Sequence, residues 1–184
     1  MIASRPMQMT WFSVMTMLLV FSGSRGGAQT SEKETLPGAQ NYTRVDRNVA
    51  CGGAIAFDAL PELKRRGFKA VINLRLPTEP NANVEAEGEA VRTAGLKYIN
   101  LPFNVAAPNA RAIVDEFMKA VVDPANQPVY IHSNAAHRVG GMWLIKRVRL
   151  DGWSVERALA EAENIGLSDS SRQFALDYVK IYSK

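Results

Sequence analysis

Cysteine and histidine are scarce in this chain. Its 184 residues include one cysteine, Cys51, and two histidines, His132 and His137. A single cysteine excludes an internal disulfide and every zinc site built from paired cysteines. The two histidines alone do not form a recognised metal-ligand spacing. We therefore expect no metal and no cofactor, and we expect Cys51 to be a buried structural residue rather than a displaced nucleophile.

An excess of charge of one sign is also missing. Lys and Arg number 22 against 18 Asp and Glu, a net charge of +4. The basic blocks are no longer than residues 64–66 and 146–147, and no basic stripe carries interleaved aromatic side chains, so nucleic acid is not an expected partner. The 47% apolar and 22% charged composition is typical of a globular chain, and the length predicts one domain.

Long hydrophobic runs are absent apart from a short one near the N-terminus. Residues 11–21 are mostly apolar, Arg5 precedes them, and the small residues 26–28 follow. This order is typical of a secretory signal peptide. The run is shorter than the ~20 residues that a membrane span needs, although an uncleaved anchor is the alternative. We expect residues 1–28 to be a signal peptide, and the mature protein to be periplasmic or secreted with no stable membrane insertion after signal removal.

The remaining sequence predicts an α/β fold. Residues 29–40 are polar and contain Pro37-Gly38, so we expect a flexible lead-in before a folded domain at 41–184. Short β-branched runs alternate with helical patterns, which predicts a central parallel four-stranded sheet flanked by helices. We expect strands at 41–45, 48–51, 69–74, 96–103 and 128–132, and helices at 56–66, 85–94, 109–123, 139–150, 154–164 and 169–182.

Local signals mark several ends of these helices. Gly67 and Gly95 are expected to end the helices that precede them. Asn109 and Ser154 are expected N-caps.

The chemistry is expected between the strand 128–132 and the helix that follows it. In a parallel sheet, ligands bind beyond the carboxyl ends of the strands. A short loop of small residues at a helix N-terminus directs backbone N–H groups toward one point, and the guanidinium of Arg138 matches two phosphate oxygens. The alternative is a tight turn in which Arg138 reaches a carboxylate. The candidate phosphate-binding residues are Ser133, Asn134, Ala135, Ala136, His137 and Arg138.

The segment from His132 to Arg138 resembles the signature loop of the cysteine phosphatases, His-Cys-(x)n-Arg. It is most similar to the small bacterial branch that resembles dual-specificity tyrosine phosphatases, whose domains also occur fused to β-lactamase-like hydrolases or NAD kinase-like domains. Residues 69–75, 94–102 and 150–163 resemble further patches of that branch, in order. The resemblance implies a cysteine-phosphatase-like fold, a phosphoric monoester hydrolase ancestry, and a loop-orienting role for His132.

Two departures from that family bear on activity. Ser133 stands at the position of the nucleophilic cysteine, and a serine hydroxyl is a far weaker acid than a thiol of pKa ~8.5. The loop after residues 101–102 carries no Asp or Glu that could protonate a leaving group, and its Asn104 is not an acid. Glu79, in the loop after the strand 69–74, is expected to be a solvated loop charge. We expect Ser133 and Arg138 to bind phosphate, a phosphorylated small molecule or a phosphorylated protein with weak or no turnover. The alternatives are an active phosphatase using Ser133 and a purely structural domain.

Other arginines and tryptophans receive structural interpretations. Arg75 is expected either to add positive charge to the pocket or to form an exposed salt bridge. Arg147 and Arg149 are expected on a solvated face. Trp143 and Trp153 are expected in the core.

Overall fold

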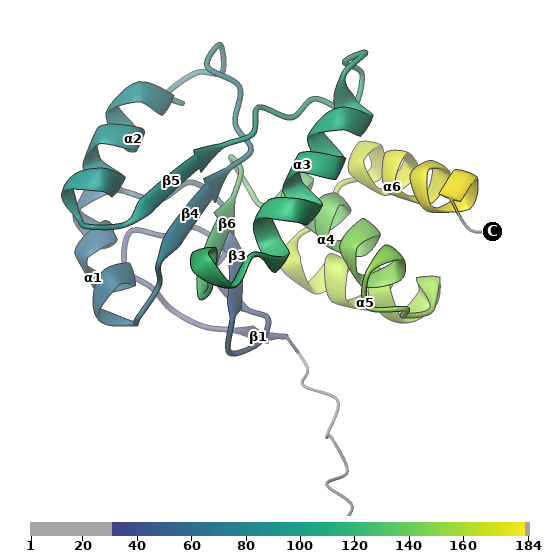
Figure 1. The fold of residues 1–184 in the computed structure, drawn as a ribbon, viewed down its shortest axis with the longest axis horizontal. Helices are drawn as coiled ribbons and strands as arrows, with labels where there is room; N and C mark the ends of the chain where they lie inside the picture. The colour runs from purple at the N-terminus through teal and green to yellow at the C-terminus, as the bar shows by residue number, and fades with distance from the viewer. Residues whose placement is uncertain (1–30, 183–184) are drawn as a thin grey trace, which may run out of the picture.

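The computed structural model describes residues 31–182, so the expected signal peptide at 1–28 lies outside the described residues (Figure 1). In this part of the chain no helix combines the length and the apolar character needed to span a membrane. The strands are β1 (Glu32–Lys33), β2 (Thr43–Arg44), β3 (Val49–Gly52), β4 (Ala70–Asn73), β5 (Lys97–Asn100) and β6 (Val129–His132). The helices are α1 (Leu60–Arg65), α2 (Val84–Thr93), α3 (Ala110–Val122), α4 (His137–Arg149), α5 (Val155–Ile165) and α6 (Asp169–Tyr182), with short 3-10 turns at Phe57–Ala59 and Pro124–Asn126.

The sheet has six strands in the order β1-β2-β3-β6-β4-β5. Strands β3, β6, β4 and β5 are parallel, as the alternation of strands and helices predicts. The expected count of four is wrong because β1 and β2 add two antiparallel strands at one edge. Strand β1 lies in the expected lead-in and has only two residues, whereas β2 falls within the strand expected at 41–45 but pairs antiparallel with its neighbours.

Residues 31–40, expected to be a flexible lead-in, instead pack against the domain. Strand β1 pairs with β2, and Leu36 is 2% exposed. The Asn164 side-chain amide, on α5, donates a hydrogen bond of 2.9 Å to the Ser31 carbonyl. These contacts hold residues 31–40 against the domain, which differs from the expected flexible lead-in. The segment is mostly polar, but its Leu36 is buried.

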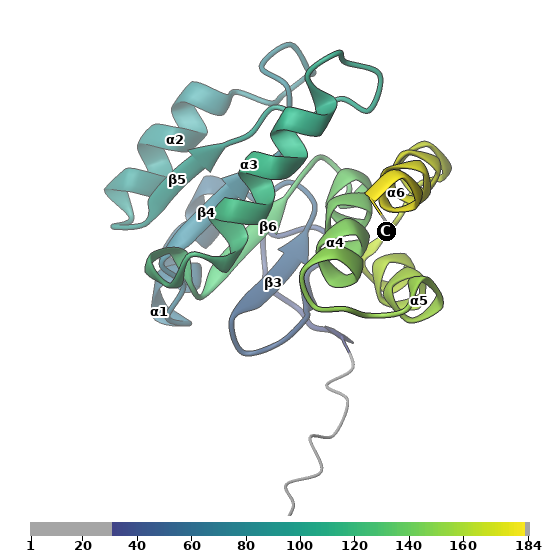
Figure 2. The same cartoon turned by 45° about the vertical axis from the view of Figure 1, so that its right-hand side comes forward.

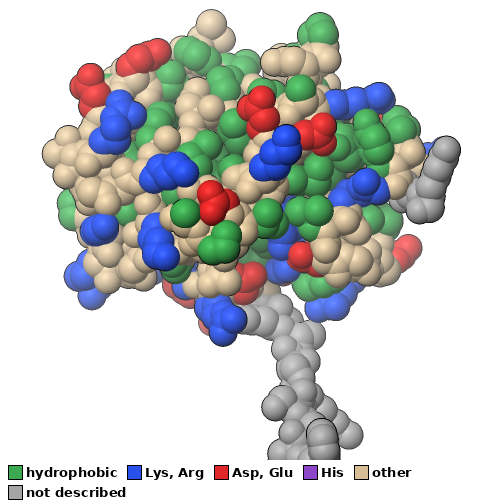
Figure 3. Space-filling model, in the orientation of Figure 1, with side chains coloured by type: hydrophobic (Ala, Val, Ile, Leu, Met, Phe, Trp, Pro, Cys, Tyr) green, Lys and Arg blue, Asp and Glu red, His purple; other side chains and the backbone are tan. Residues whose placement is uncertain are grey.

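Helices cover both faces of the sheet (Figures 1 and 2). Side chains alternate between the faces along each strand. Val71 and Tyr130 belong to a core beneath α1 and α2, whereas Ile72 and Ile131 belong to the larger core beneath α3, α4, α5 and α6. On the face shown in Figure 3, basic and acidic side chains are interspersed rather than gathered into one patch.

Arg147 is not on a solvated face, contrary to expectation. It is 8% exposed, and its Nε donates to the Glu161 carboxylate at 2.6 Å. Its guanidinium also lies over the rings of Trp143 and Trp153, 4.7 and 4.2 Å from their centroids. The sequence prediction fails because α5 packs on this side of α4. Arg149 is exposed, and Trp143 is in the core, as expected.

The expected helix ends are mostly confirmed. Ser154 accepts a hydrogen bond from the Arg157 amide at 3.3 Å, and Gly67 and Gly95 follow their helices with positive φ of 86° and 74°. Asn109 makes no side-chain capping bond. The amide of Ala110, the first residue of α3, donates to the carbonyl of residue 107 at 3.0 Å.

Candidate active site

Strand β6 places the loop 133–138, hereafter the signature loop, at the centre of the sheet. Strand β6 lies between β3 and β4, and all four of its residues are buried. The loop is tied to β3, because the Ser133 amide donates to the Gly52 carbonyl at 3.3 Å and the Ala54 amide donates to the Asn134 carbonyl at 2.8 Å. Gly53 permits this approach, since a Cβ there would lie 2.7 Å from the Asn134 carbonyl oxygen. The Ser133 amide therefore already donates a hydrogen bond within the sheet.

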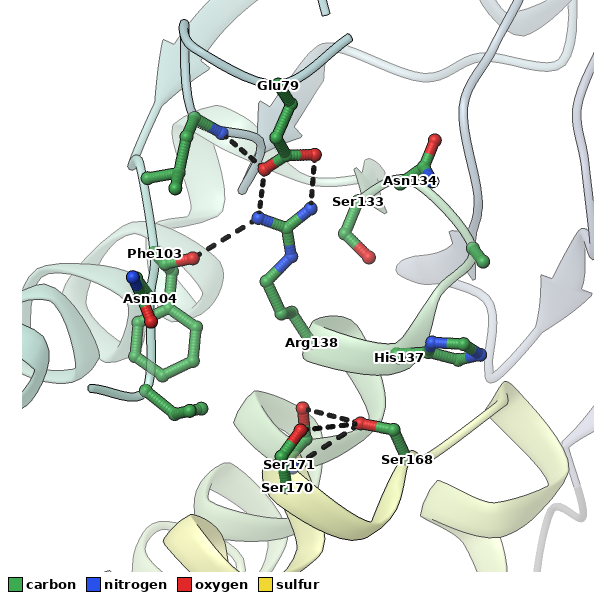
Figure 4. A pocket seen from close by; sticks show the side chains of 13 residues that line it. Glu79, Phe103, Asn104, Ser133, Asn134, His137, Arg138, Ser168, Ser170 and Ser171 are labelled. Atoms are coloured by element: carbon green, nitrogen blue, oxygen red, sulfur yellow. Dashed lines mark hydrogen bonds and ion pairs between the residues drawn. The ribbon is translucent and has the colours of Figure 1, made fainter. Parts of the chain in front are cut away.

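A cavity of about 410 Å³ opens beside the loop, at the carboxyl ends of the parallel strands (Figure 4). Ala136 does not line it: this residue is fully buried, with a left-handed backbone of φ 67° and ψ −2°. The other five candidate residues do line it: Ser133, Asn134, Ala135, His137 and Arg138. The remaining wall consists of Leu76, Glu79, Phe103, Asn104, Val105, Ser168, Ser170 and Ser171.

Ser133 is the most buried polar group of the loop. The residue is 1% exposed, and its Oγ has no hydrogen-bond partner among the described residues. Figure 4 shows the hydroxyl directed into the cavity beside Arg138. A buried hydroxyl without a partner is costly, so a polar ligand atom in the cavity would be stabilised here.

The guanidinium of Arg138 also lies in the cavity, paired with the carboxylate of Glu79. Its two terminal nitrogens each donate to one Glu79 oxygen, with NH2 at 2.9 Å from Oε2, and NH1 donates to the Phe103 carbonyl at 3.2 Å. The expected alternative, in which Arg138 reaches a carboxylate, is thus realised within the pocket itself.

Glu79 is not a solvated loop charge, contrary to expectation. The loop after β4 folds back over the cavity, so that Glu79 also accepts a hydrogen bond from the Leu76 amide at 2.8 Å. Burial acts to raise the pKa of Glu79, but hydrogen bonds from Arg138 and the Leu76 amide outweigh it and hold the pKa below its usual value. Glu79 is therefore an anion at neutral pH and a poor proton donor.

Arg75 holds this loop in place and does not line the cavity. It is 4% exposed, so the expected exposed salt bridge is wrong. Its NH1 and NH2 donate to the carbonyls of Asn81 and Pro80 at 3.0 and 2.9 Å, and its Nε lies 3.5 Å from a Glu79 oxygen. Its positive charge therefore contributes to lowering the pKa of Glu79.

His132 is fully buried behind the loop and faces away from the cavity. Its Nε2 is 2.7 Å from the carboxylate of Glu87, on α2. Asn73 donates to the same carboxylate at 3.2 Å and to the Tyr98 hydroxyl at 2.9 Å. The loop-orienting role of His132 stays a prediction, but these contacts fix its ring.

Sequence reasoning missed Glu87 and the serine wall of the pocket. Glu87 shares one face of α2 with Val84 and Val91, and a carboxylate on an apolar helix face is a readable signal for a buried partner. Ser168, Ser170 and Ser171 reach the cavity only through the packing of α6, so no local pattern marks them.

Cys51 has no place in the site. It is fully buried on β3 in the larger core. Burial, with smaller contributions from Glu161 and Asp46, raises the pKa of its thiol well above the usual value. The structure therefore confirms a buried structural cysteine.

The fold defines a class of protein. It is that of solved cysteine-phosphatase-like structures. A DUF442 protein of Shewanella putrefaciens CN-32 matches with a TM-score of 0.66 and 19% identity, covering 80% of this chain and 96% of that one. Pseudomonas aeruginosa TpbA, solved as a cysteine-to-serine variant in complex with phosphotyrosine, matches with a TM-score of 0.62 and 18% identity over 83% and 90%. The catalytic core of the Saccharomyces cerevisiae PP-IP phosphatase Siw14, in complex with citrate, gives 0.60 and 19% over 77% and 86%.

The family follows from the sequence match. A family model described as "DSP-PTPase phosphatase fused to NAD+ Kinase" matches residues 25–174, and the chain belongs to this family. The Oryza sativa subsp. japonica protein named "Probable NAD kinase 2, chloroplastic" is 30% identical over 83 residues, which are 45% of this chain. The matched segment is 8% of that protein's length.

Proposed function

We propose that this chain binds phosphate or a phosphorylated ligand in the signature-loop pocket and hydrolyses it weakly or not at all. The observation that carries the proposal is the Ser133 hydroxyl, buried without a partner and directed into a cavity that also holds Arg138. The start of α4 adds the positive end of a helix dipole at the same place. A phosphoryl oxygen can accept hydrogen bonds from the Ser133 hydroxyl and from Arg138, and the helix dipole of α4 stabilises its negative charge.

Weak or absent turnover follows from the groups around Ser133. Without a base, its hydroxyl stays protonated and is a poor nucleophile. No hydrogen bond joins it to a described residue, and His132 is committed to Glu87. Glu79 is the one carboxylate in the wall of the cavity, and it is bound to Arg138. His137 also lines the cavity, but no hydrogen bond joins it to the Ser133 hydroxyl, so neither an activated nucleophile nor a free carboxylic acid is in place.

Two relatives support binding of an anion in this fold. The TpbA structure pairs a cysteine-to-serine change with bound phosphotyrosine, and the Siw14 structure holds citrate. Family membership favours the alternative of an active phosphoric monoester hydrolase, which the following assay separates from the binder.

The test compares turnover and binding in matched variants. Hydrolysis of p-nitrophenyl phosphate is measured for the wild type, for Ser133→Cys, and for Ser170→Cys, which places a thiol in the same cavity away from the N-terminus of α4. We expect turnover only for Ser133→Cys, because the loop and the helix lower the pKa of a thiol there. Calorimetry with inorganic phosphate should show Arg138→Ala binding about 10- to 100-fold more weakly than the wild type.

Other outcomes decide against the binder. Efficient turnover by the wild type that is abolished in Arg138→Ala identifies an active phosphatase. Absence of phosphate and vanadate binding, with no effect of Arg138→Ala, identifies a structural domain.

We further propose that the protein is exported by its N-terminal segment. The basic residue, apolar run and small residues of positions 5–28 support this. Expression of the full chain in a bacterial host should give a periplasmic or secreted product whose N-terminus, read by sequencing, is residue 29. A product that retains its N-terminus in the membrane fraction would identify an anchor instead.

A further inference from the structure

The wall of the cavity opposite Glu79 is built from serines at the start of α6 (Figure 4). Ser168 precedes the helix, and its Oγ lies 3.1 Å from the Oγ of Ser171 and 3.3 Å from that of Ser170. Ser171 is 2% exposed, whereas Ser170 is exposed. Each hydroxyl donates one hydrogen bond and accepts others, so this serine wall is complementary to ligand hydroxyl groups.

The charges of the cavity limit the ligand to one anionic group. Arg138 is the one Lys or Arg in the cavity wall, and Glu79 already opposes its charge. A second phosphate on the serine side would have no Lys or Arg of the cavity wall to pair with it. The part of the ligand that reaches the serine wall is therefore neutral and polar.

The cavity also lacks a surface for an aromatic leaving group. Phe103 is the one Phe, Tyr or Trp in its wall, and this side chain is 1% exposed. Its ring packs edge-on against Phe174, with centroids 5.3 Å apart and planes at 69°. No face of a Phe, Tyr or Trp ring is left open in the wall for an aryl group to stack upon.

We infer that the pocket is selective for the monophosphate ester of a sugar or another polyhydroxylated compound. The phosphate lies against Ser133 and Arg138, and the hydroxyl groups of the ligand bond to Ser168 and Ser170. The inference rests on the proposed function, and the buried, unpartnered Ser133 hydroxyl directed into the same cavity supports it independently of the serine wall.

The test is a set of four titrations of the purified full chain by calorimetry. The probes are inorganic phosphate, glucose 6-phosphate, phenyl phosphate and fructose 1,6-bisphosphate. We expect glucose 6-phosphate to bind about tenfold more tightly than inorganic phosphate, as one or two added hydrogen bonds supply. Phenyl phosphate and the bisphosphate should show no such gain.

A pair of variants assigns the gain to the serine wall. The double variant Ser168→Ala with Ser170→Ala should lose the tenfold advantage of glucose 6-phosphate while keeping the affinity for inorganic phosphate. Ser154→Ala is the matched control, because it removes a hydroxyl from the start of α5, outside the cavity. It should leave both affinities unchanged. Thermal melts verify that each variant is folded.

The outcomes separate this inference from the proposed function. Equal affinity for glucose 6-phosphate and inorganic phosphate, or tighter binding of phenyl phosphate or the bisphosphate, overturns the inference and leaves the proposed function standing. Retention of the tenfold advantage in the double variant also overturns it. Failure of all four probes to bind overturns the proposed function, and the inference falls with it.

Discussion

At the scale of single residues, the wall of the cavity holds an ion pair between Arg138 and Glu79. Both terminal nitrogens of the guanidinium donate to the carboxylate, so an arriving oxyanion must displace Glu79 or share Arg138 with it. The carboxylate also repels an anion bound nearby. For the binding function proposed here, we therefore expect Glu79 to keep the affinity for phosphate below what Arg138 alone would give.

Removing this charge should strengthen anion binding. We expect Glu79→Gln to bind inorganic phosphate about 3- to 10-fold more tightly than the wild type in calorimetry at low ionic strength, because a repulsive charge is lost. Glu62→Gln is the control, since Glu62 pairs with Arg65 and Arg66 on α1, outside the cavity. Weaker binding by Glu79→Gln would instead show that holding Arg138 in position is the larger effect.

At the scale of elements, two adjacent glycines let α4 pack closely against α5 and α6. A Cβ at Gly140 would lie 2.9 Å from the carbonyl oxygen of Ala162, and one at Gly141 would lie 3.0 Å from Ser171. These are contacts with backbone or with a buried side chain, so the helices themselves would have to move. The glycines thus bring the start of α6, and its serines, to the cavity.

The substitution Gly140→Ala should destabilise the protein. Alanine is a better helix former by about 1 kcal/mol, yet overpacking against the α5 backbone costs about 1–3 kcal/mol. We expect a net loss of stability in urea unfolding and a lower melting temperature. A gain in stability would show that the α4–α5 contact yields easily.

Most elements could be predicted from local patterns. The helices end within a few residues of expectation because Gly67, Gly95 and Ser154 carry strong end signals. Strand β1 has only two residues and lacks such a pattern, and Asn109 precedes α3 without a side-chain capping bond.

Only part of the site could be predicted from the sequence. The signature loop is contiguous, so the sequence alone indicated Ser133 and Arg138. Glu79 lies 54 residues before Ser133 in the sequence, and the first serine of the wall, Ser168, lies 35 residues after it. All of them nevertheless line the same cavity. Their convergence depends on the order of strands in the sheet, which local patterns do not encode.

For the whole molecule, partly exposed ion pairs predict how stability depends on pH. Burial acts to raise the pKa values of Glu79 and Asp151, but bonds from Arg138 and Leu76 to the first, and from Lys146 and Arg147 to the second, hold both below their usual values. The folded state therefore binds fewer protons than the unfolded chain in the acid range. This stabilisation is present above the unfolded pKa values and is lost as the pH falls through the folded ones.

Urea unfolding between pH 6 and pH 3 measures this loss. We expect the midpoint to fall as the pH falls, and to fall less steeply in Glu79→Gln, where the neutral amide does not titrate. Equal pH dependence in both proteins would contradict a stabilising role for the Glu79 ion pair.

The left-handed backbone at Ala136 bears on how a ligand arrives. An alanine in that conformation costs about 1–2 kcal/mol, which the surrounding fold must supply by holding the chain there. Full burial and the ties of neighbouring residues to β3 provide that restraint. We therefore expect this part of the loop to be held in place before a ligand of the proposed kind arrives, so that such a ligand would cost little loop entropy on binding.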